Sequence, residues 1–153
     1  MKALLGSAVV EAAVRSALAE VPDPEIPVVS VVDLGMVESV EVDGDRIRVE
    51  LLPTFVGCPA LDLIRDAVTA RLSTFGRPVE VEFGFRVPWT SDRITPAGRS
   101  RLRASGFAPP DEAACPHCGS ANVALENLFG PTQCRSIYWC RACRQPFESF
   151  KSV

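Results

Sequence analysis

The stretch Cys115-Pro116-His117-Cys118, followed after twenty-one residues by Cys140-Arg141-Ala142-Cys143, decides the fold of the C-terminal part of the chain. Two residues between paired cysteines let the backbone turn so that both sulfurs reach one ion, and a second pair completes a tetrahedron. A segment of about forty residues buries too little apolar surface to fold alone, and a bound metal supplies the missing stability. The spacing therefore predicts a four-cysteine zinc ribbon over residues 109–153.

Three other interpretations of these cysteines have to be weighed. Two disulfides would use the same residues, but paired knuckles without a secretory leader favour a metal. Rubredoxin-like iron uses the same four thiolates, so the spacing leaves zinc and iron both open. His117 lies inside the first knuckle and is expected to be a spacer, because four cysteines already fill a tetrahedron.

The composition of the chain argues against several classes of partner. The 153 residues carry a net charge of −3, and residues 109–153 hold four basic and four acidic side chains, so the ribbon lacks the positive charge of a nucleic-acid-binding module. No apolar run approaches the roughly eighteen residues of a membrane span, and the apolar start of the chain is too short for a signal peptide. We therefore expect a cytoplasmic protein that binds neither nucleic acid nor membrane.

Residues 1–108 show the periodicities of a small α+β domain. Apolar residues recur at helical spacing near the start, two alternating segments flank an Asp-Gly-Asp turn, and a second apolar helix face follows. A Pro-rich stretch, residues 21–27, is expected to form a stiff, exposed loop with two carboxylates. The expected elements are helices over 7–20 (capped by Ser7), 60–75 and 95–105, strands over 36–42, 46–52 and 79–85, and a linker over 108–112. The order predicts a two-layer sheet-and-helix domain followed by the ribbon.

Cys58 is the only cysteine outside the C-terminal module. Gly57 permits tight backbone geometry and Pro59 suits the first turn of a helix, so Cys58 should lie beside a helix N-terminus, where the dipole stabilises a thiolate. The residue is thus a candidate nucleophile or soft-metal ligand, although free cysteines are often small buried hydrophobes. Asp23 and Glu25 could add oxygen ligands if their loop lies near Cys58; otherwise they are ordinary exposed acids.

The segments Asp23-Pro24-Glu25-Ile26-Pro27, Val32-Asp33-Leu34-Gly35 and Pro53-Thr54-Phe55-Val56-Gly57-Cys58-Pro59 resemble the iron–sulfur assembly domain shared by SufT and related maturation factors. With the ribbon segments Phe129-Gly130-Pro131-Thr132-Gln133-Cys134 and Pro146-Phe147-Glu148-Ser149-Phe150-Lys151, the chain resembles the PaaD (PaaJ) family of accessory subunits of phenylacetyl-CoA epoxidase. The resemblance covers nearly the whole chain after the first helix.

The resemblance implies an accessory maturation factor, not an enzyme, for iron–sulfur or iron centres of the epoxidase system in aerobic phenylacetate catabolism. Its client would be the reductase cluster. Separately, a single cysteine outside the ribbon, Cys58, favours a homodimer that bridges a transient cluster between two copies of the chain. The family's acidic loop corresponds to Asp23 and Glu25, its hydroxyl position to Thr54 and its cysteine to Cys58. Cys134 also corresponds to a position in the family's pattern. Its role is left open between an additional thiol, a substitute ligand and a packing residue.

Other functions are compatible with parts of the pattern. The chain could be a structural or docking subunit of the oxygenase complex, in which Cys58 would have no role in cluster supply. A thiol oxidoreductase is disfavoured because Cys58 has no neighbouring resolving cysteine.

Overall fold

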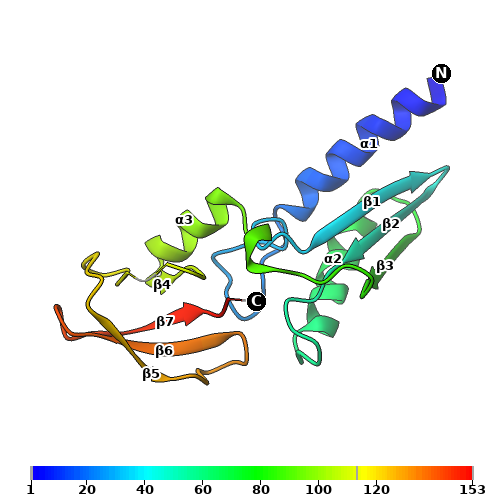
Figure 1. Cartoon of the computed structure of the whole chain (residues 1–153). Helices are drawn as coiled ribbons and strands as arrows, with labels where there is room; N and C mark the ends of the chain where they lie inside the picture. The colour runs from blue at the N-terminus through cyan, green and yellow to red at the C-terminus, as the bar shows by residue number, and fades with distance from the viewer. Residues whose placement is uncertain (1, 113, 153) are drawn as a thin grey trace. The chain divides into compact units, whose positions relative to one another are not determined.

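The computed structural model describes residues 2–112 and 114–152 (Figure 1). The chain separates into two compact units, Met1–Trp89 and Thr90–Val153. Each unit has its own sheet, three-stranded in the first and four-stranded in the second. The α+β class predicted from the sequence is confirmed.

The first unit is a three-stranded sheet with two helices. Its elements are α1 (Lys2–Leu18), β1 (Val37–Asp43), β2 (Arg46–Leu51), α2 (Leu61–Ser73) and β3 (Val79–Phe83). Strands β1 and β2 form an antiparallel hairpin around Gly44, whose φ of 58° suits glycine in a tight turn. Strand β3 lies parallel to β2, because the chain crosses over through α2 before it returns.

Alternation along β2 determines which face of this sheet is covered. Ile47, Val49 and Leu51 are buried, whereas Arg46 and Arg48 on the other face are exposed. Helix α1 packs on β1, and α2 packs on β3. The buried helix residues are Val14, Ala17, Leu18, Ile64, Val68 and Leu72. The result is the two-layer arrangement expected from the sequence.

Two details of the N-terminal region differ from expectation. Helix α1 begins at Lys2, so Ser7 lies inside it, and its hydroxyl donates to the carbonyl of Val42 at 2.8 Å. The predicted cap at Ser7 is therefore wrong, because the helix already begins at Lys2 and continues through Gly6 in spite of its low helix propensity. The Pro-rich loop was also expected to be exposed, but Val21, Asp23 and Ile26 are buried within it. Its path is fixed by a β-bridge between Pro22 and Ser30.

The second unit begins with two short helices and continues into the ribbon. Its elements are η1 (Ser91–Arg93), α3 (Pro96–Ala104), β4 (Phe107–Ala108), β5 (Val123–Asn127), β6 (Arg135–Cys140) and β7 (Pro146–Phe150). The sheet order is β4-β7-β6-β5, with β4 parallel to β7 and the other pairs antiparallel. Thr95 caps α3 by accepting a hydrogen bond from the backbone N–H of Gly98, as predicted from Thr95-Pro96.

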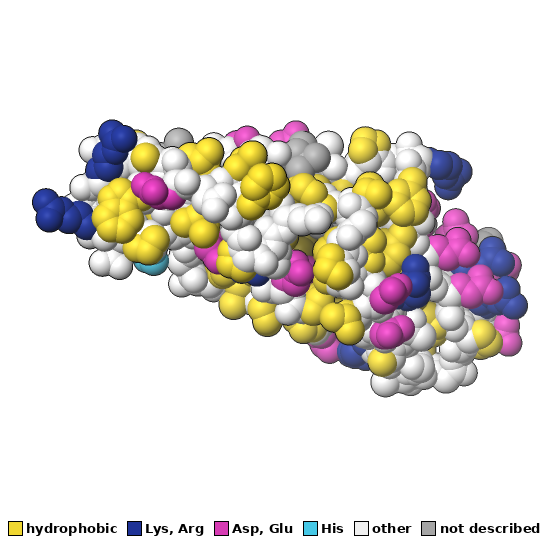
Figure 2. Space-filling model, turned by 90° about the horizontal axis from the view of Figure 1, so that it is seen from below, with side chains coloured by type: hydrophobic (Ala, Val, Ile, Leu, Met, Phe, Trp, Pro, Cys, Tyr) yellow, Lys and Arg dark blue, Asp and Glu magenta, His cyan; other side chains and the backbone are white. Residues whose placement is uncertain are grey.

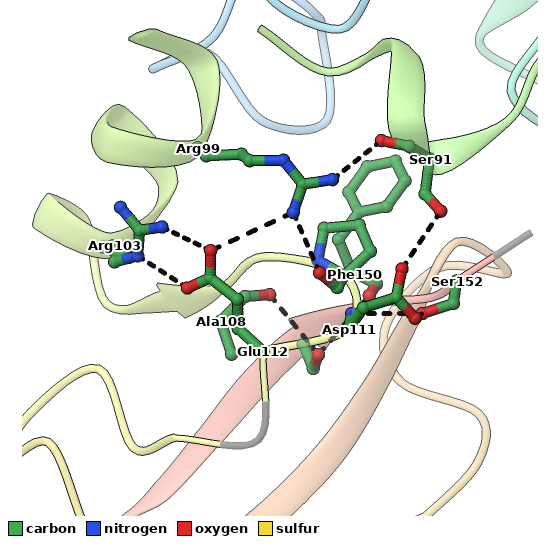
Figure 3. A network of polar contacts seen from close by, with 10 residues as sticks. Ser91, Arg99, Arg103, Ala108, Asp111, Glu112, Phe150 and Ser152 are labelled. Atoms are coloured by element: carbon green, nitrogen blue, oxygen red, sulfur yellow. Dashed lines mark hydrogen bonds and ion pairs between the residues drawn. The ribbon is translucent and has the colours of Figure 1, made fainter. Parts of the chain in front are cut away.

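The linker expected over residues 108–112 is an ordered part of the second unit (Figure 3). Arg99 donates to the carbonyls of Ser91 and Pro110, and Arg103 forms an ion pair with Glu112. These contacts group residues 90–108 with the ribbon, whereas the composition predicted a boundary after residue 108. A functional division into residues 1–108 and 109–153 stays a prediction.

On the face drawn in Figure 2, hydrophobic side chains are exposed at many points and basic side chains do not gather into one continuous patch. Within residues 2–112 and 114–152, no helix combines the length and apolar character that a membrane span requires.

Candidate functional site

Four cysteines of the ribbon bring their sulfur atoms together. Cys115 and Cys118 lie in the loop before β5, Cys140 ends β6, and Cys143 lies in the turn before β7. All four Sγ atoms lie within 4.8 Å of one another, with 3.8 Å between Cys115 and Cys143 and 3.6 Å between Cys118 and Cys140. Four sulfurs placed about 2.3 Å from a central ion in a tetrahedron are about 3.8 Å apart. The donor set and its spacing therefore fit a metal ion.

The neighbouring groups also favour a metal thiolate site. A disulfide needs sulfurs about 2.05 Å apart, and all six cysteines are free. Backbone N–H groups of Cys143 and Ala142 lower the pKa of Cys140, whereas desolvation raises the pKa of the neighbouring Cys143, so the two thiols share their proton unequally. The backbone N–H of His117 donates to Cys115 Sγ, while its ring packs edge-on against Phe147. His117 thus supports the knuckle through its backbone and lies outside the four-sulfur group.

Cys134 lies at the opposite end of β6 from Cys140. The two are six residue steps apart along the strand, which at about 3.3 Å per step places them roughly 20 Å apart. Its buried Sγ lies 3.1 Å from the hydroxyl of Thr132, and its carbonyl accepts from the backbone of Lys151. Cys134 therefore lies away from the four-sulfur group.

Cys58 lies in the loop between β2 and α2, in the first unit. The loop turns at Gly57, whose φ is +79°, and the Cys58 carbonyl accepts from the N–H of Leu61, the first residue of α2. Cys58 therefore lies beside the start of the helix, as predicted. The thiol and Thr54 are both half-buried, whereas Val56 at the loop tip is 79% exposed.

The charge state of Cys58 differs from expectation. Burial raises the pKa of its thiol, a hydrogen bond from the Ala60 backbone lowers it, and the charges of Glu25 and Asp23 raise it. The expected stabilisation by the helix start is thus present, but desolvation and the two carboxylates outweigh it. The raised pKa disfavours the thiolate, which is the form in which a cysteine acts as a nucleophile.

The acidic loop owes its shape to Asp23. Its Oδ1 accepts hydrogen bonds from the backbone N–H groups of Glu25 and Ile26, both at 2.8 Å. The carboxylate is buried and holds the turn, so Asp23 is not the ordinary exposed acid that the sequence also allowed. Glu25 is half-buried, and both carboxylates lie close enough to Cys58 to influence it.

The structure thus brings Cys58, Asp23 and Glu25 into one region without closing them into a compact ligand set. Among the described residues, only the ribbon cysteines have ligand atoms that all lie within 4.8 Å. The two sites therefore differ in kind: one is assembled for a metal, and the other is an open region with one thiol.

Both parts of the chain match families of known proteins. Residues 11–83 match the family model described as an iron–sulfur cluster assembly protein, and residues 101–151 match the PaaD zinc beta ribbon domain. The chain is 39% identical over 147 residues to a putative subunit of 1,2-phenylacetyl-CoA epoxidase, its D component, from Escherichia coli (strain K12), covering 89% of each protein. This chain belongs to the PaaD family.

Solved structures match a part of this PaaD-family chain. A domain of unknown function, DUF59, from Bacillus anthracis superposes with a TM-score of 0.61 at 27% identity, covering 65% of the chain and 96% of that domain. A conserved hypothetical protein from Thermotoga maritima gives 0.50 at 30% identity, covering 58% and 89%. These matches support the α+β fold class.

Sequence reasoning missed two contacts in the first unit of this PaaD-family chain. The Ala60 backbone N–H bonds to the thiol, a contact that the Pro59-Ala60 helix start could have indicated. The indole N–H of buried Trp89 donates to the carbonyl of Leu34 at 2.7 Å, which fixes the end of the long loop before β1. No periodicity signals that contact, because the two residues are far apart in sequence.

Proposed function

We propose that this protein is a non-enzymatic accessory factor that matures iron–sulfur or iron centres of the phenylacetyl-CoA ring epoxidase system, in aerobic phenylacetate catabolism. Its client is the cluster of the reductase. Iron or a cluster is the cargo, and Cys58 is the residue that ligates it for transfer.

The observation that carries this proposal is the placement of Asp23 and Glu25 beside Cys58. Two loops that are distant in sequence bring a thiol and two carboxylates into one region, close enough for both charges to raise the pKa of the thiol. A positive ion favours all three as anions, and it displaces the proton from the thiol. The region is therefore better suited to an arriving metal cargo than to thiol chemistry at neutral pH.

Within this region the residues have different roles. Glu25 is the proposed oxygen ligand, whereas Asp23 positions the loop because two backbone N–H groups occupy its Oδ1. Thr54 lies on the same loop as Cys58 and is proposed to donate its hydroxyl to the bound cargo. An incomplete set of ligands suits transfer, because the client or a second copy of the chain must supply the rest.

The ribbon cysteines are proposed to hold zinc as a structural ion. Four cysteines with no open position are typical of structural zinc sites. The ribbon would then hold its fold and dock onto the client.

The proposal is tested by anaerobic reconstitution of the apo-reductase. We expect the wild-type protein to increase the amount of cluster in the reductase, and Cys58→Ala to lose this effect. Cys134→Ala is the matched control, because it removes a buried thiol that lies outside both sites. If Cys58→Ala acts as well as the wild type, the chain is instead a structural or docking subunit of the oxygenase complex.

A further inference from the structure

Strand β3 ends the sheet of the first unit, so one of its two edges has no neighbour (Figure 1). The strand order is β1-β2-β3, and β3 pairs with β2 alone. At one end of this pairing the N–H of Ile47 donates to the carbonyl of Pro78 at 2.9 Å. At the other end the N–H of Gly84 donates to the carbonyl of Leu51 at 2.8 Å. Backbone groups along a strand point alternately to its two sides, so the even-numbered residues from 78 to 84 bond to β2.

The odd-numbered residues of β3 turn their backbone groups to the outer edge. These residues are Val79, Val81 and Phe83, and no strand in residues 2–112 and 114–152 pairs with that edge. A row of unpaired N–H and C=O groups is the template to which an extended chain adds as a further strand. The outer edge of β3 therefore has the backbone chemistry of a docking site.

The two faces of β3 differ in character. Val79, Val81 and Phe83 are half-buried and lie opposite the buried residues of β2, on the face where α2 packs. Glu80 and Glu82 lie on the uncovered face, because side chains alternate along a strand. An added strand alternates in the same way, so the edge favours apolar residues that alternate with residues suited to carboxylates.

The uncovered face beside β3 is hollowed and acidic. The hollow has a volume of about 540 Å³, and its ionisable lining consists of Glu41, Glu50, Glu80, Glu82, Arg48 and Arg86. Four carboxylates thus face two guanidinium groups, and the lining is negative. The side chains that an added strand directs to this face would meet that negative charge.

The carboxylates nearest the outer edge are poorly balanced by cations. Glu80 is held between two arginines of β2, at 2.8 and 3.0 Å. Glu82 is exposed and forms no ion pair with another described residue, and its cross-strand neighbour on β2 is Glu50. Arg86 approaches Glu50 only to 3.8 Å, from a side chain that is 88% exposed. Like charges that lie opposite each other on a sheet repel, so a basic side chain beside Glu82 would stabilise this face.

The same charges disfavour a second copy of β3 as the added strand. Two identical edges that join into one sheet around a two-fold axis are antiparallel. When they are centred on Val81, Glu80 of each chain lies opposite Glu82 of the other, and both pairs repel. Lysine or arginine at these positions instead meets the carboxylates with opposite charge. The edge therefore favours a basic segment of another polypeptide.

We propose that the outer edge of β3 binds an extended segment of a partner protein in which basic and apolar residues alternate. The segment adds as a further strand through the backbone groups of Val79, Val81 and Phe83. Its basic side chains lie against Glu80 and Glu82, and its apolar side chains extend the covered face. The proposal does not depend on metal transfer at Cys58, which lies in the loop before α2 and not on β3.

The test is titration of the full-length, zinc-loaded protein with a blocked nonapeptide of alternating valine and lysine, followed by amide chemical shifts and amide hydrogen exchange. We expect the peptide to slow exchange at Val79, Val81 and Phe83, whose N–H groups point to the outer edge. Glu80 and Glu82, whose N–H groups point to β2, should change less. A peptide with glutamate in place of lysine should bind at least roughly tenfold more weakly.

Backbone methylation distinguishes strand addition from charge attraction alone. The N–H groups of an added strand point alternately toward β3 and away from it. N-methylation of all the valines, or of all the lysines, should therefore abolish binding in one case and be tolerated in the other. Binding that survives both modifications would overturn strand addition, and so would binding that is lost with both.

Variants of the protein test the two contributions separately. Glu82→Gln should weaken the lysine peptide roughly two- to fivefold. Glu11→Gln is the matched control and should have no effect, because α1 packs on β1 at the other edge of the sheet. Val81→Pro removes an N–H that points away from β2, so it should abolish binding while the amide spectrum of β1 and β2 stays intact.

The proposal is overturned if neither peptide binds, if the lysine and glutamate peptides bind equally, or if Glu82→Gln binds the lysine peptide as tightly as the wild type does. Sedimentation of the wild type and Val81→Pro tests the other occupant. A wild-type dimer that Val81→Pro dissociates would assign the edge to a second copy of the chain and also overturn the proposal.

Discussion

Asp23 shapes the acidic loop from a buried position. Its Oδ1 accepts two backbone N–H groups at 2.8 Å, in a loop that carries three prolines and so cannot satisfy its backbone through regular structure. The carboxylate therefore takes the place of backbone partners. Its contribution to the site comes mainly through the shape that it gives the loop.

We predict that Asp23→Ala lowers the free energy of unfolding of the first unit by roughly 2–4 kcal/mol, because it leaves two N–H groups without their acceptor. Asp23→Asn keeps an acceptor oxygen and should lose less than half of that. Urea unfolding measured by circular dichroism compares the three proteins. Equal stability of the alanine variant and the wild type would show that other groups take over both hydrogen bonds.

Glu25 acts on Cys58 through its charge, so its removal should change the titration of the thiol. A nearby anion disfavours the thiolate, and Glu25→Gln should therefore lower the pKa of Cys58 and move the pH profile of its alkylation to lower pH. Iodoacetamide labelling followed by mass spectrometry of the Cys58 peptide measures this profile.

The control is Glu41→Gln, which removes a carboxylate from β1, away from the loops that carry Cys58 and Glu25. It should leave the profile unchanged. A profile that stays in place for Glu25→Gln would mean that the carboxylate is too far from the thiol to support the proposed site.

Sequence reasoning identified the position of Cys58 but not its charge state. Gly57 and Pro59 are local signals, and they place the thiol beside the start of α2. Burial and the approach of Asp23 and Glu25 depend on the folded chain, and burial is the largest influence on the pKa. The burial of Asp23 was missed for the same reason, because Pro-rich composition alone suggests an exposed loop.

At the scale of elements, the ribbon depends on its metal. Its buried cluster consists of Ala108, Cys115, Cys140 and Phe147, so two of four core residues are themselves proposed ligands. Such a core cannot fold strands β5–β7 unaided, whereas zinc supplies roughly 10–16 kcal/mol of apparent folding free energy to such modules.

We predict that Cys118→Ser, or removal of zinc by a chelator, abolishes amide protection in β5–β7 and leaves β1–β3 protected. Hydrogen exchange measured by mass spectrometry reports both sheets in one experiment. Cys134→Ser is the control and should keep both zinc and protection, because Cys134 lies at the far end of β6 from Cys140. Retained protection in β5–β7 after complete loss of metal would contradict the structural role of the ion.

Elements with strong local signals were predictable, and those that depend on distant pairing were not. The hairpin around Gly44, helix α2 and the cap at Thr95 each have a signal in neighbouring residues. The parallel placement of β3 beside β2 and of β4 beside β7 has none. The pairing of β4 explains why contacts group residues before 109 with the ribbon.

At the scale of the whole molecule, the two cysteine sites lie in different compact units. Cys58 belongs to the unit Met1–Trp89, and the four ribbon cysteines belong to Thr90–Val153. Each unit has its own sheet, so loss of one site should leave the other intact. Because of this separation, a structural ion at the ribbon cysteines and a transferable cargo at Cys58 can be tested independently.

The most direct test is metal and acid-labile sulfide analysis of protein purified without oxygen, wild type beside Cys58→Ala. We expect about one zinc per chain in both proteins, with iron and sulfide in the wild type alone. Iron that survives the loss of Cys58 would place iron in the ribbon and contradict the assignment of the two sites. Zinc in both and iron in neither would contradict stable carriage of a cargo by Cys58.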